Sequence, residues 1–317
     1  MSVLVGLIVM LGMLVVVPAG LRLVDGPQPA TLRLLRRAWP LLAVPGAFSL
    51  WLPRSPLAVA LACCYALATL ALALHAPARL ALTRSVAPAE IAVLTALATP
   101  SVAGLALVAE RAGHELFGFD LDILALTVPH FHFAGFAAAL VAGLVCRTAE
   151  GRATRFAALS VPLGTLLVLL GYFVDDWAEL AGALVLTAGM WAVALAVWRE
   201  PRTTAPDRVT RALLGTSAAV LVATMLLALS WALGEATGIP HPSLTWMAAT
   251  HGLGNALGFA LCSLLAWHRL RPPAAGTPAA VRPGAATPAA ATSPDRTPPT
   301  LTSAVTTVTA HRTELPA

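Results

Sequence analysis

Long apolar stretches alternate with short polar ones through most of the chain. A helix that crosses a lipid bilayer needs about 20 consecutive, mostly apolar residues. That requirement predicts nine membrane spans, at residues 3–21, 38–53, 56–75, 89–109, 122–146, 156–174, 179–198, 212–233 and 244–268. We therefore expect an all-α fold, a polytopic transmembrane helix bundle with about nine spans.

The first two of these spans need a separate argument. No basic residue precedes the apolar run of 3–21 and no small-residue cleavage site follows it, although a cleaved secretory signal requires both. We expect this segment to remain as a helix. The second span, 38–53, is short and contains Pro45, so hydropathy alone supports it less than the others.

The composition agrees with a membrane protein. Hydrophobic residues make up 58% of the 317 residues and charged residues 11%, whereas soluble proteins carry about 25% charged residues. The net charge of +5 would suit a nucleic-acid partner, but the basic residues lie between apolar spans, where membrane topology explains them. We expect the lipid bilayer as a partner and no nucleic acid.

All twenty basic residues are arginines, and their distribution orients the chain. With the N-terminus outside and nine crossings, the outer loops contain only Arg54 and Arg111. The cytoplasmic loops contain fifteen: Arg22, Arg33, Arg36, Arg37, Arg79, Arg84, Arg147, Arg152, Arg155, Arg199, Arg202, Arg208, Arg211, Arg269 and Arg271. Membrane proteins carry such an excess of arginine on their cytoplasmic side. Leaving out 38–53 would move every later loop to the other side and abolish the excess. We therefore expect a plasma-membrane protein with its N-terminus outside and its C-terminus in the cytoplasm.

The composition changes after Arg271. Residues 272–317 are rich in Pro, Ala and Thr and lack periodic aliphatic residues. Such a segment cannot bury enough apolar area to offset its ordering entropy. The sequence thus predicts two parts, a transmembrane bundle over 1–271 and a disordered cytoplasmic tail over 272–317.

Two histidine motifs interrupt the apolar spans, TVPHFHFAGF at 127–136 and THGLGNALGF at 250–259. Both of their spans are predicted to run from the outside inward. His130 and His132 lie 8 and 10 residues after Asp122, and His251 lies 9 residues after Pro242. At 1.5 Å per residue, all three histidines are expected ~12–15 Å below the outer surface.

Each motif also places small residues along one helix face, at the i, i+3, i+4, i+7 and i+11 positions. The two strips are His132, Gly135, Ala139 and Gly143 in the fifth span, and His251, Gly254, Asn255, Gly258 and Cys262 in the ninth. Small residues let transmembrane helices approach closely, so we expect these spans to pack together with His132 and His251 in register. The alternative is chance, because Gly and Ala are abundant throughout the chain. His130 would face the opposite side of a regular helix, unless a distortion at Pro129 turns both rings toward one cavity.

Polar side chains inside a membrane span are costly and point to function. His130, His132, His251 and Asn255 are therefore candidates for substrate binding or for a proton relay. The three histidines are equally candidate ligands for zinc, copper or haem iron. A plainer interpretation is that each one only joins two helices through a hydrogen bond.

Acidic residues and histidines gather on the predicted outer side. We interpret five of them as an acidic rim that attracts cations toward the site: Glu110, His114, Asp175, Asp176 and Glu235. Glu179 and His241 lie on the same side. The alternative is that acids are simply tolerated there, since they contribute little to topology.

No catalytic signature is present. The sequence contains no HExxH, no GxSxG, no Walker motif and no glycine-rich dinucleotide fingerprint. No pair of carboxylates lies deep within a span, so we assign no catalytic residue and favour a protein that is not an enzyme.

At the two histidine motifs the sequence resembles the YndJ-like family of bacterial integral membrane proteins. The segments that carry the resemblance are HFHFAGF, His130 to Phe136, and THGLGNALGFALC, Thr250 to Cys262. The resemblance covers the region from the fourth span to the ninth and excludes the proline-rich tail. It implies a multi-pass membrane protein of a bacterial cell, in a family often labelled as transporters.

Three hypotheses follow. The first is a transporter or permease-like protein that takes a small molecule or an ion into an outward-facing histidine site. The second is a membrane-embedded metal or haem protein, including an oxidoreductase, with the same histidines as ligands. The third is a structural or signalling membrane protein in which the histidines only hold helices together.

Overall fold

The computed structural model describes residues 2–26, 30–149 and 151–271 of the 317-residue chain. The chain divides into two compact units, Met1–Pro272 and Pro273–Ala317. The predicted tail, 272–317, lies outside the described residues. Every regular element in the described part is helical, which confirms the all-α prediction.

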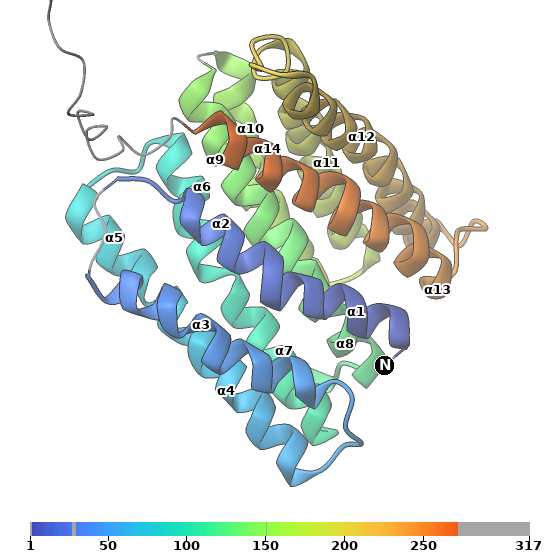
Figure 1. Ribbon diagram of the computed structural model, residues 1–317. Coiled ribbons are helices and arrows are strands. Elements are labelled where there is room, and N and C mark those ends of the chain that lie inside the picture. Colours follow the sequence, from blue (N-terminus) through green and yellow to red (C-terminus); the bar gives the residue numbers. More distant parts are fainter. Residues whose placement is uncertain (1, 27–29, 150, 272–317) are drawn as a thin grey trace, which may run out of the picture. The chain divides into compact units, whose positions relative to one another are not determined.

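The first unit is a bundle of helices, several of which join end to end (Figure 1). In chain order the elements are α1 (Val3–Leu11), η1 (Gly12–Val16), α2 (Val17–Leu23), α3 (Ala30–Ser49), α4 (Pro56–Ala73), α5 (His75–Thr83), α6 (Pro88–Ala98), α7 (Pro100–Ala112), η2 (Leu116–Gly118), α8 (Leu121–His130), η3 (Phe131–Ala137), α9 (Ala138–Thr148), α10 (Arg152–Gly171), α11 (Asp176–Arg199), α12 (Arg208–Thr237), α13 (Leu244–Met247), η4 (Ala248–Gly252), η5 (Gly254–Leu261) and α14 (Cys262–Leu270). The η2 turn is a 3₁₀-helix, and η1, η3, η4 and η5 are π-helical.

Within the described residues, eight helices are long and apolar enough to cross a membrane. They are Val3–Leu23, Pro56–Thr83, Pro88–Ala112, Leu121–Thr148, Arg152–Gly171, Asp176–Arg199, Arg208–Thr237 and Leu244–Leu270. Each corresponds to one of the predicted spans. The protein is thus a polytopic, multi-pass membrane protein.

The predicted second span, 38–53, differs from the structure. The helix in this place, α3, begins at Ala30 and ends at Ser49, and it is not among the eight. Its first half carries three arginines, Arg33, Arg36 and Arg37, which a membrane span does not tolerate across its width. Eight of the nine predicted spans thus have spanning composition, whereas α3, at the place of the second, is apolar only in its second half.

Contacts along α3 show that it nonetheless runs antiparallel to α1 and α2. Near its start, the Arg36 guanidinium donates to the carbonyl of Val24, at 3.4 Å. Further along, Trp39 Nε1 donates to the carbonyl of Met13, at 2.8 Å. Just beyond its end, Trp51 Nε1 lies 3.0 Å from the sulfur of Met10. In Figure 1, α3 lies beside α4 along its length.

The two ends of the bundle are named here by the ends of its first helix. At the Val3 end, Arg54 before α4 pairs with Glu110 in α7, at 3.0 Å. At the Leu23 end, His268 Nε2 in α14 donates to the carbonyl of Ala19 in α2, at 3.0 Å. Successive long helices therefore run in opposite directions between the two ends.

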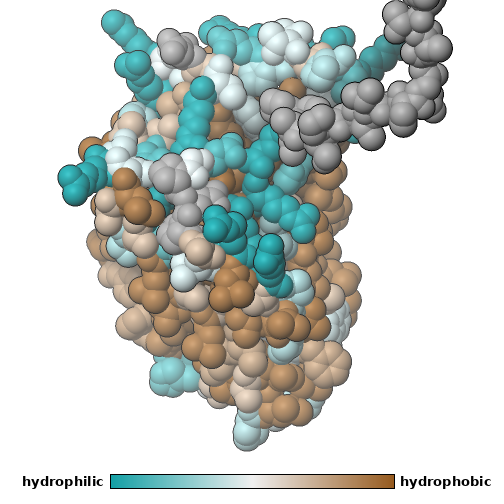
Figure 2. Space-filling model, turned by 60° about the vertical axis from the view of Figure 1, so that its left-hand side comes forward, coloured by the Kyte–Doolittle hydropathy of each residue, from teal (hydrophilic) through white to brown (hydrophobic). Residues whose placement is uncertain are grey.

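Apolar side chains cover much of the outside of the bundle. On α10 the exposed leucines recur every three or four residues, at Leu159, Leu163, Leu166 and Leu170. This spacing places them on one outward face. Figure 2 shows hydrophobic side chains over much of one face of the molecule, with hydrophilic ones gathered mainly toward its upper end. Such a surface suits lipid contact better than water.

Candidate functional site

Both histidine motifs form π-helical turns. The first motif contains Pro129 in α8, followed directly by η3, and the second forms η4 and η5. Proline lacks the backbone N–H that a regular helix needs, which explains the distortion in the first motif. In π-helical turns the backbone hydrogen bonds connect residues i and i+5, and such turns occur frequently at functional sites. Both stretches thus depart from regular α-helical geometry where their polar residues lie.

His132 is fully buried on the inner face of η3, against α4 and η1. Its Nε2 lies 2.5 Å from the hydroxyl of Tyr65, and the ring of Trp39 packs edge-on against Tyr65, with 5.9 Å between centroids. A Cβ atom placed on Gly12 would collide with the His132 ring. His132 therefore belongs to a packed contact between helices and does not line a cavity.

A cavity of about 420 Å³ lies on the other side of α8, toward the Val3 end. Residues from α1, α7, α8, α10, α11, α12 and the α13–η5 segment line it. His130, His251 and Asn255 are among these residues, whereas His132 is not. The Nε2 atom of His130 is buried and has no hydrogen-bond partner. The distortion at Pro129 therefore does not turn the two neighbouring histidines toward one cavity.

His251 is fixed by two hydrogen bonds. Its Nδ1 lies 2.8 Å from the carbonyl oxygen of Thr224, and its Nε2 lies 3.1 Å from Nδ2 of Asn255. A carbonyl only accepts, so Nδ1 carries the proton and Nε2 accepts from the amide. The hydroxyl of Thr224 in turn donates to Oδ1 of Asn255, at 2.8 Å. Asn255 thus orients a neutral imidazole against α12.

The predicted packing of the two small-residue strips is wrong. A Cβ on Gly135 would lie 2.9 Å from Thr99, and one on Gly143 would lie 3.1 Å from the carbonyl of Ala89, so the first strip packs on the span that precedes it. A Cβ on Gly254 would lie 2.9 Å from Thr224 in α12. The second strip therefore also packs on the preceding span. The faces of His132 and His251 therefore do not meet, although η3 and η5 contact each other.

Two of the five predicted rim residues line the cavity, Asp176 and Glu235. Glu235 pairs with His241, whose Nε2 lies 2.6 Å away. Asp175 instead caps α11 by accepting from the backbone N–H of Ala178, at 2.8 Å. His114 is exposed and does not line the cavity.

Glu110 does not lie at an exposed rim. Only 1% of it is exposed. It is paired with Arg54, at 3.0 Å, and with the adjacent Arg111. The acid is therefore neutralised inside the protein.

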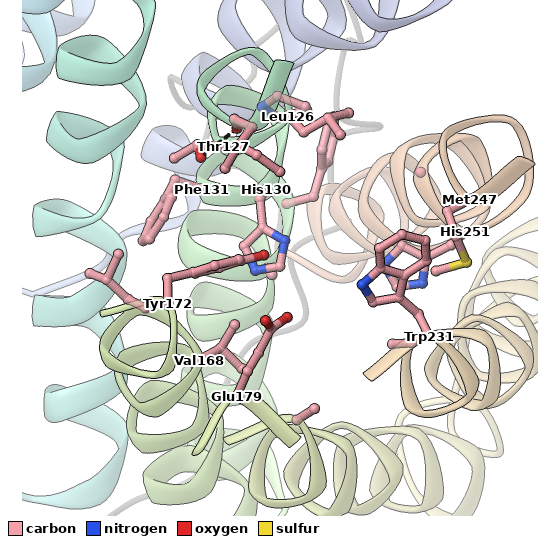
Figure 3. Close-up of a pocket in the computed structure, with 18 of the residues that line it drawn as sticks. Leu126, Thr127, His130, Phe131, Val168, Tyr172, Glu179, Trp231, Met247 and His251 are labelled. Atoms are coloured by element: carbon pink, nitrogen blue, oxygen red, sulfur yellow. Dashed lines mark hydrogen bonds between the residues drawn. The ribbon is translucent and has the colours of Figure 1, made fainter. Parts of the chain in front are cut away.

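The cavity wall also contains residues that were not predicted as site residues, among them Glu179, Tyr172 and Trp231. Figure 3 shows the carboxylate of Glu179 pointing into the space between His130 and Tyr172 on one side and Trp231 and His251 on the other. Glu179 follows the rim residue Asp176 by three positions, so the two lie on the same helix face. That spacing is a signal in the sequence that places Glu179 with the site.

The sequence model of one protein family, described as YndJ-like protein, matches residues 7–259. The chain belongs to the YndJ-like family. The match begins in the first span, so it extends further toward the N-terminus than the resemblance at the two motifs indicated, and it includes both motifs. No curated protein and no solved structure matches the chain.

The cavity of this YndJ-like protein does not assemble the predicted three-histidine metal site. Among the described residues, no three His, Cys, Asp or Glu side chains are placed to hold one metal ion. His132 is bonded to Tyr65 outside the cavity, and the Nε2 of His251 is bonded to Asn255. The side chains present therefore do not fit a zinc or copper centre built from His130, His132 and His251.

Proposed function

We propose that this YndJ-like protein is a transporter or permease-like protein and that the cavity holds its substrate. The observation that carries the proposal is a cavity lined by His130, whose buried Nε2 has no hydrogen-bond partner. Leaving such a group unpaired costs about 1–3 kcal/mol. A bound substrate that hydrogen-bonds to His130 recovers that free energy.

The cavity walls suit a protein that changes shape. His130 lies between Pro129 and η3, and His251 and Asn255 lie in η4 and η5. Interrupted helices at the substrate site are a recurring feature of membrane transporters. The hydrogen-bonded group of Thr224, Asn255 and His251 supplies a fixed wall, opposite the free nitrogen of His130.

The proposed orientation places the Val3 end outside. The fifteen arginines assigned to the cytoplasm lie toward the Leu23 end, most of them in the terminal turns of helices or in the first half of α3, whereas Arg54 and Arg111 lie at the Val3 end. The positive-inside rule then puts the cavity mouth outside and the C-terminus in the cytoplasm. The corresponding compartment is the plasma membrane of a bacterial cell.

Cysteine accessibility tests this proposal without knowledge of the substrate. Ala228 in α12 lines the cavity, and Leu226, two residues away, is 53% exposed and does not. Each is changed to cysteine in a chain whose four native cysteines are replaced by alanine. A membrane-impermeant thiol reagent is then applied to cells and, separately, to inverted membrane vesicles.

A transporter exposes its substrate site alternately to both sides. We expect Ala228→Cys to react from both sides and Leu226→Cys, which faces lipid, to react from neither. Labelling of Ala228→Cys from the outside alone would leave a one-sided binding cavity and rule out transport. Labelling from neither side would rule out the cavity itself.

A further inference from the structure

The charges around the cavity are of one sign. Of the residues that the structure describes, three acids line it, Asp176, Glu179 and Glu235, and no arginine does. The chain has no lysine. The two histidines that line the cavity, His130 and His251, have no acid as a hydrogen-bond partner. The wall thus carries acidic side chains without an arginine to match them.

Among the described residues, only one of these acids contacts a basic side chain. Glu235 is paired with His241. Within the described residues, neither Asp176 nor Glu179 takes part in an ion pair. Glu179 points into the cavity (Figure 3) and is only partly exposed. A carboxylate in such a position is stabilised by an opposite charge nearby.

Aromatic rings lie beside this carboxylate. Trp231 and Tyr172 both line the cavity, on opposite sides of Glu179 (Figure 3). A cation over the face of an aromatic ring is attracted to it, most strongly when the ring is tryptophan. The rings and the acid therefore favour the same kind of ligand group.

The rest of the wall is mainly apolar. It includes Met190, Met225, Met247, Phe131, Phe133 and Phe259. An inorganic cation would leave this surface without a partner, whereas an organic ligand would cover it. The buried Nε2 of His130 adds one polar contact.

We infer that the cavity takes an organic cation, an ammonium group attached to an apolar body. The ammonium binds between Glu179, Trp231 and Tyr172, and the apolar body lies against the methionine and phenylalanine side chains. This inference rests on the proposed function, because it names the substrate class of the same cavity. An anion of the same shape would meet the acids and lose affinity.

Three probes with one apolar body test the charge preference: phenylbutylammonium, phenylbutanol and phenylbutyrate. Their binding to the full-length protein, purified in an uncharged detergent, is measured by calorimetric titration. We expect the ammonium to bind about 10-fold more tightly than the alcohol and the carboxylate to bind more weakly than both. A tenfold change corresponds to the loss of one favourable charge contact in a partly desolvated site.

Two variants locate the site. Glu179→Gln is expected to weaken phenylbutylammonium about 10-fold and to leave phenylbutanol unchanged. Glu115→Gln removes an exposed acid that does not line the cavity, and it is expected to change neither. Any of the following results would overturn the inference: tighter binding of the alcohol or the carboxylate than of the ammonium, equal affinities for all three probes, no binding of any probe, or equal effects of the two variants.

These results are separate from the accessibility experiment. Labelling of Ala228→Cys from the outside only, together with selective ammonium binding, would reject transport and keep the ligand class. Labelling from both sides without a preference for the ammonium would reject the ligand class and keep transport.

Discussion

The bundle contains two regions that differ in how their acidic side chains are paired. In the packed region, formed by α3, α4, α5, α6, α7 and α9, each buried glutamate has two arginine partners. Glu90 pairs with Arg79 and with Arg147, the latter at 3.1 Å, and Glu110 pairs with Arg54 and Arg111. In the cavity region, formed by α8, α11, α12 and the η4–η5 segment, Asp176 and Glu179 have no such partners. Acids therefore stabilise the packed region, whereas in the cavity region they remain available to a ligand.

The same contrast appears within one helix. His132 faces the packed region and is bonded to Tyr65. His130, two residues earlier, lines the cavity, and its buried Nε2 has no hydrogen-bond partner. Identical side chains at nearly the same depth thus have different roles, because the helix turns one toward neighbouring helices and the other toward open space.

The largest effect is expected from breaking a buried ion-pair cluster. Glu90→Gln leaves Arg79, whose side chain is 4% exposed, without its carboxylate. Breaking a buried pair by removing one partner costs about 3–5 kcal/mol. Glu179→Gln is the matched change in the cavity region and is expected to leave stability unchanged. Thermal unfolding of both variants in detergent measures the difference, and equal losses would contradict the contrast between the regions.

A smaller loss is expected where His132 packs against η1. Gly12→Ala places a methyl group into the His132 ring, and overpacking of this kind costs about 1–3 kcal/mol. The matched control is Gly252→Ala in η4, where the nearest side chain, Ile8, is 3.7 Å from the new Cβ. We expect the control to unfold at the temperature of the unchanged protein. A comparable loss in Gly252→Ala would show that the cavity wall is as tightly packed as the interior.

Two substitutions at the histidines are expected to change the stability of the protein differently. Tyr65→Phe removes the hydroxyl that pairs with His132 and leaves a buried nitrogen unpaired, at a cost of about 1–3 kcal/mol. His130→Leu removes a buried nitrogen that is already unpaired, so stability is expected to stay the same or rise slightly while phenylbutylammonium binding weakens. Unfolding and titration on the same samples separate the two outcomes. A large loss of stability in His130→Leu would assign His130 to the packing.

The smallest effect concerns acid sensitivity at the Leu23 end. The pKa of Asp207 is lowered from 3.8 to about 2, first by the backbone N–H of Thr210, then by its hydroxyl, and also by Arg269. A lowered pKa contributes stability above the ordinary value, and this contribution is lost as the pH falls through about 2. The unchanged protein is therefore expected to lose stability as the pH falls from about 4 to about 2, and the Asp207→Asn variant is expected to lose less over the same range. Unfolding temperatures measured across that range test it, and an unchanged pH profile would contradict it.

Much of the fold follows from hydropathy, and the exceptions have physical causes. The eight spanning helices are continuous apolar segments, so their pattern is local. The helix α3 begins earlier than predicted because arginines continue a helix as well as apolar residues do, and hydropathy detects only the part suited to lipid. The family and the multi-pass class were likewise accessible from the sequence.

The site was only partly predictable. The face assignments assumed 3.6 residues per turn, whereas 131–137 and 248–252 are π-helical, so the residues that share a face change. Nothing local to Glu110 reveals that Arg54, far away in sequence, approaches it. The association of His130, His251 and Asn255 with one cavity was predicted, because both motifs lie at similar depth in spans of the same direction. The role of these residues stays a prediction until binding is measured.

The two glutamate–arginine clusters also define a length. Glu90 and Glu110 lie near opposite ends of the continuous helix Pro88–Ala112, 20 residues apart. At 1.5 Å per residue this separation is ~30 Å, which equals the thickness of the hydrocarbon layer of a typical bilayer, about 30 Å. The clusters set the position of the protein along the membrane normal, because a shift in either direction would move one set of charges into the hydrocarbon layer. They fix the depth of the bundle in the membrane, and with it the depth of the cavity.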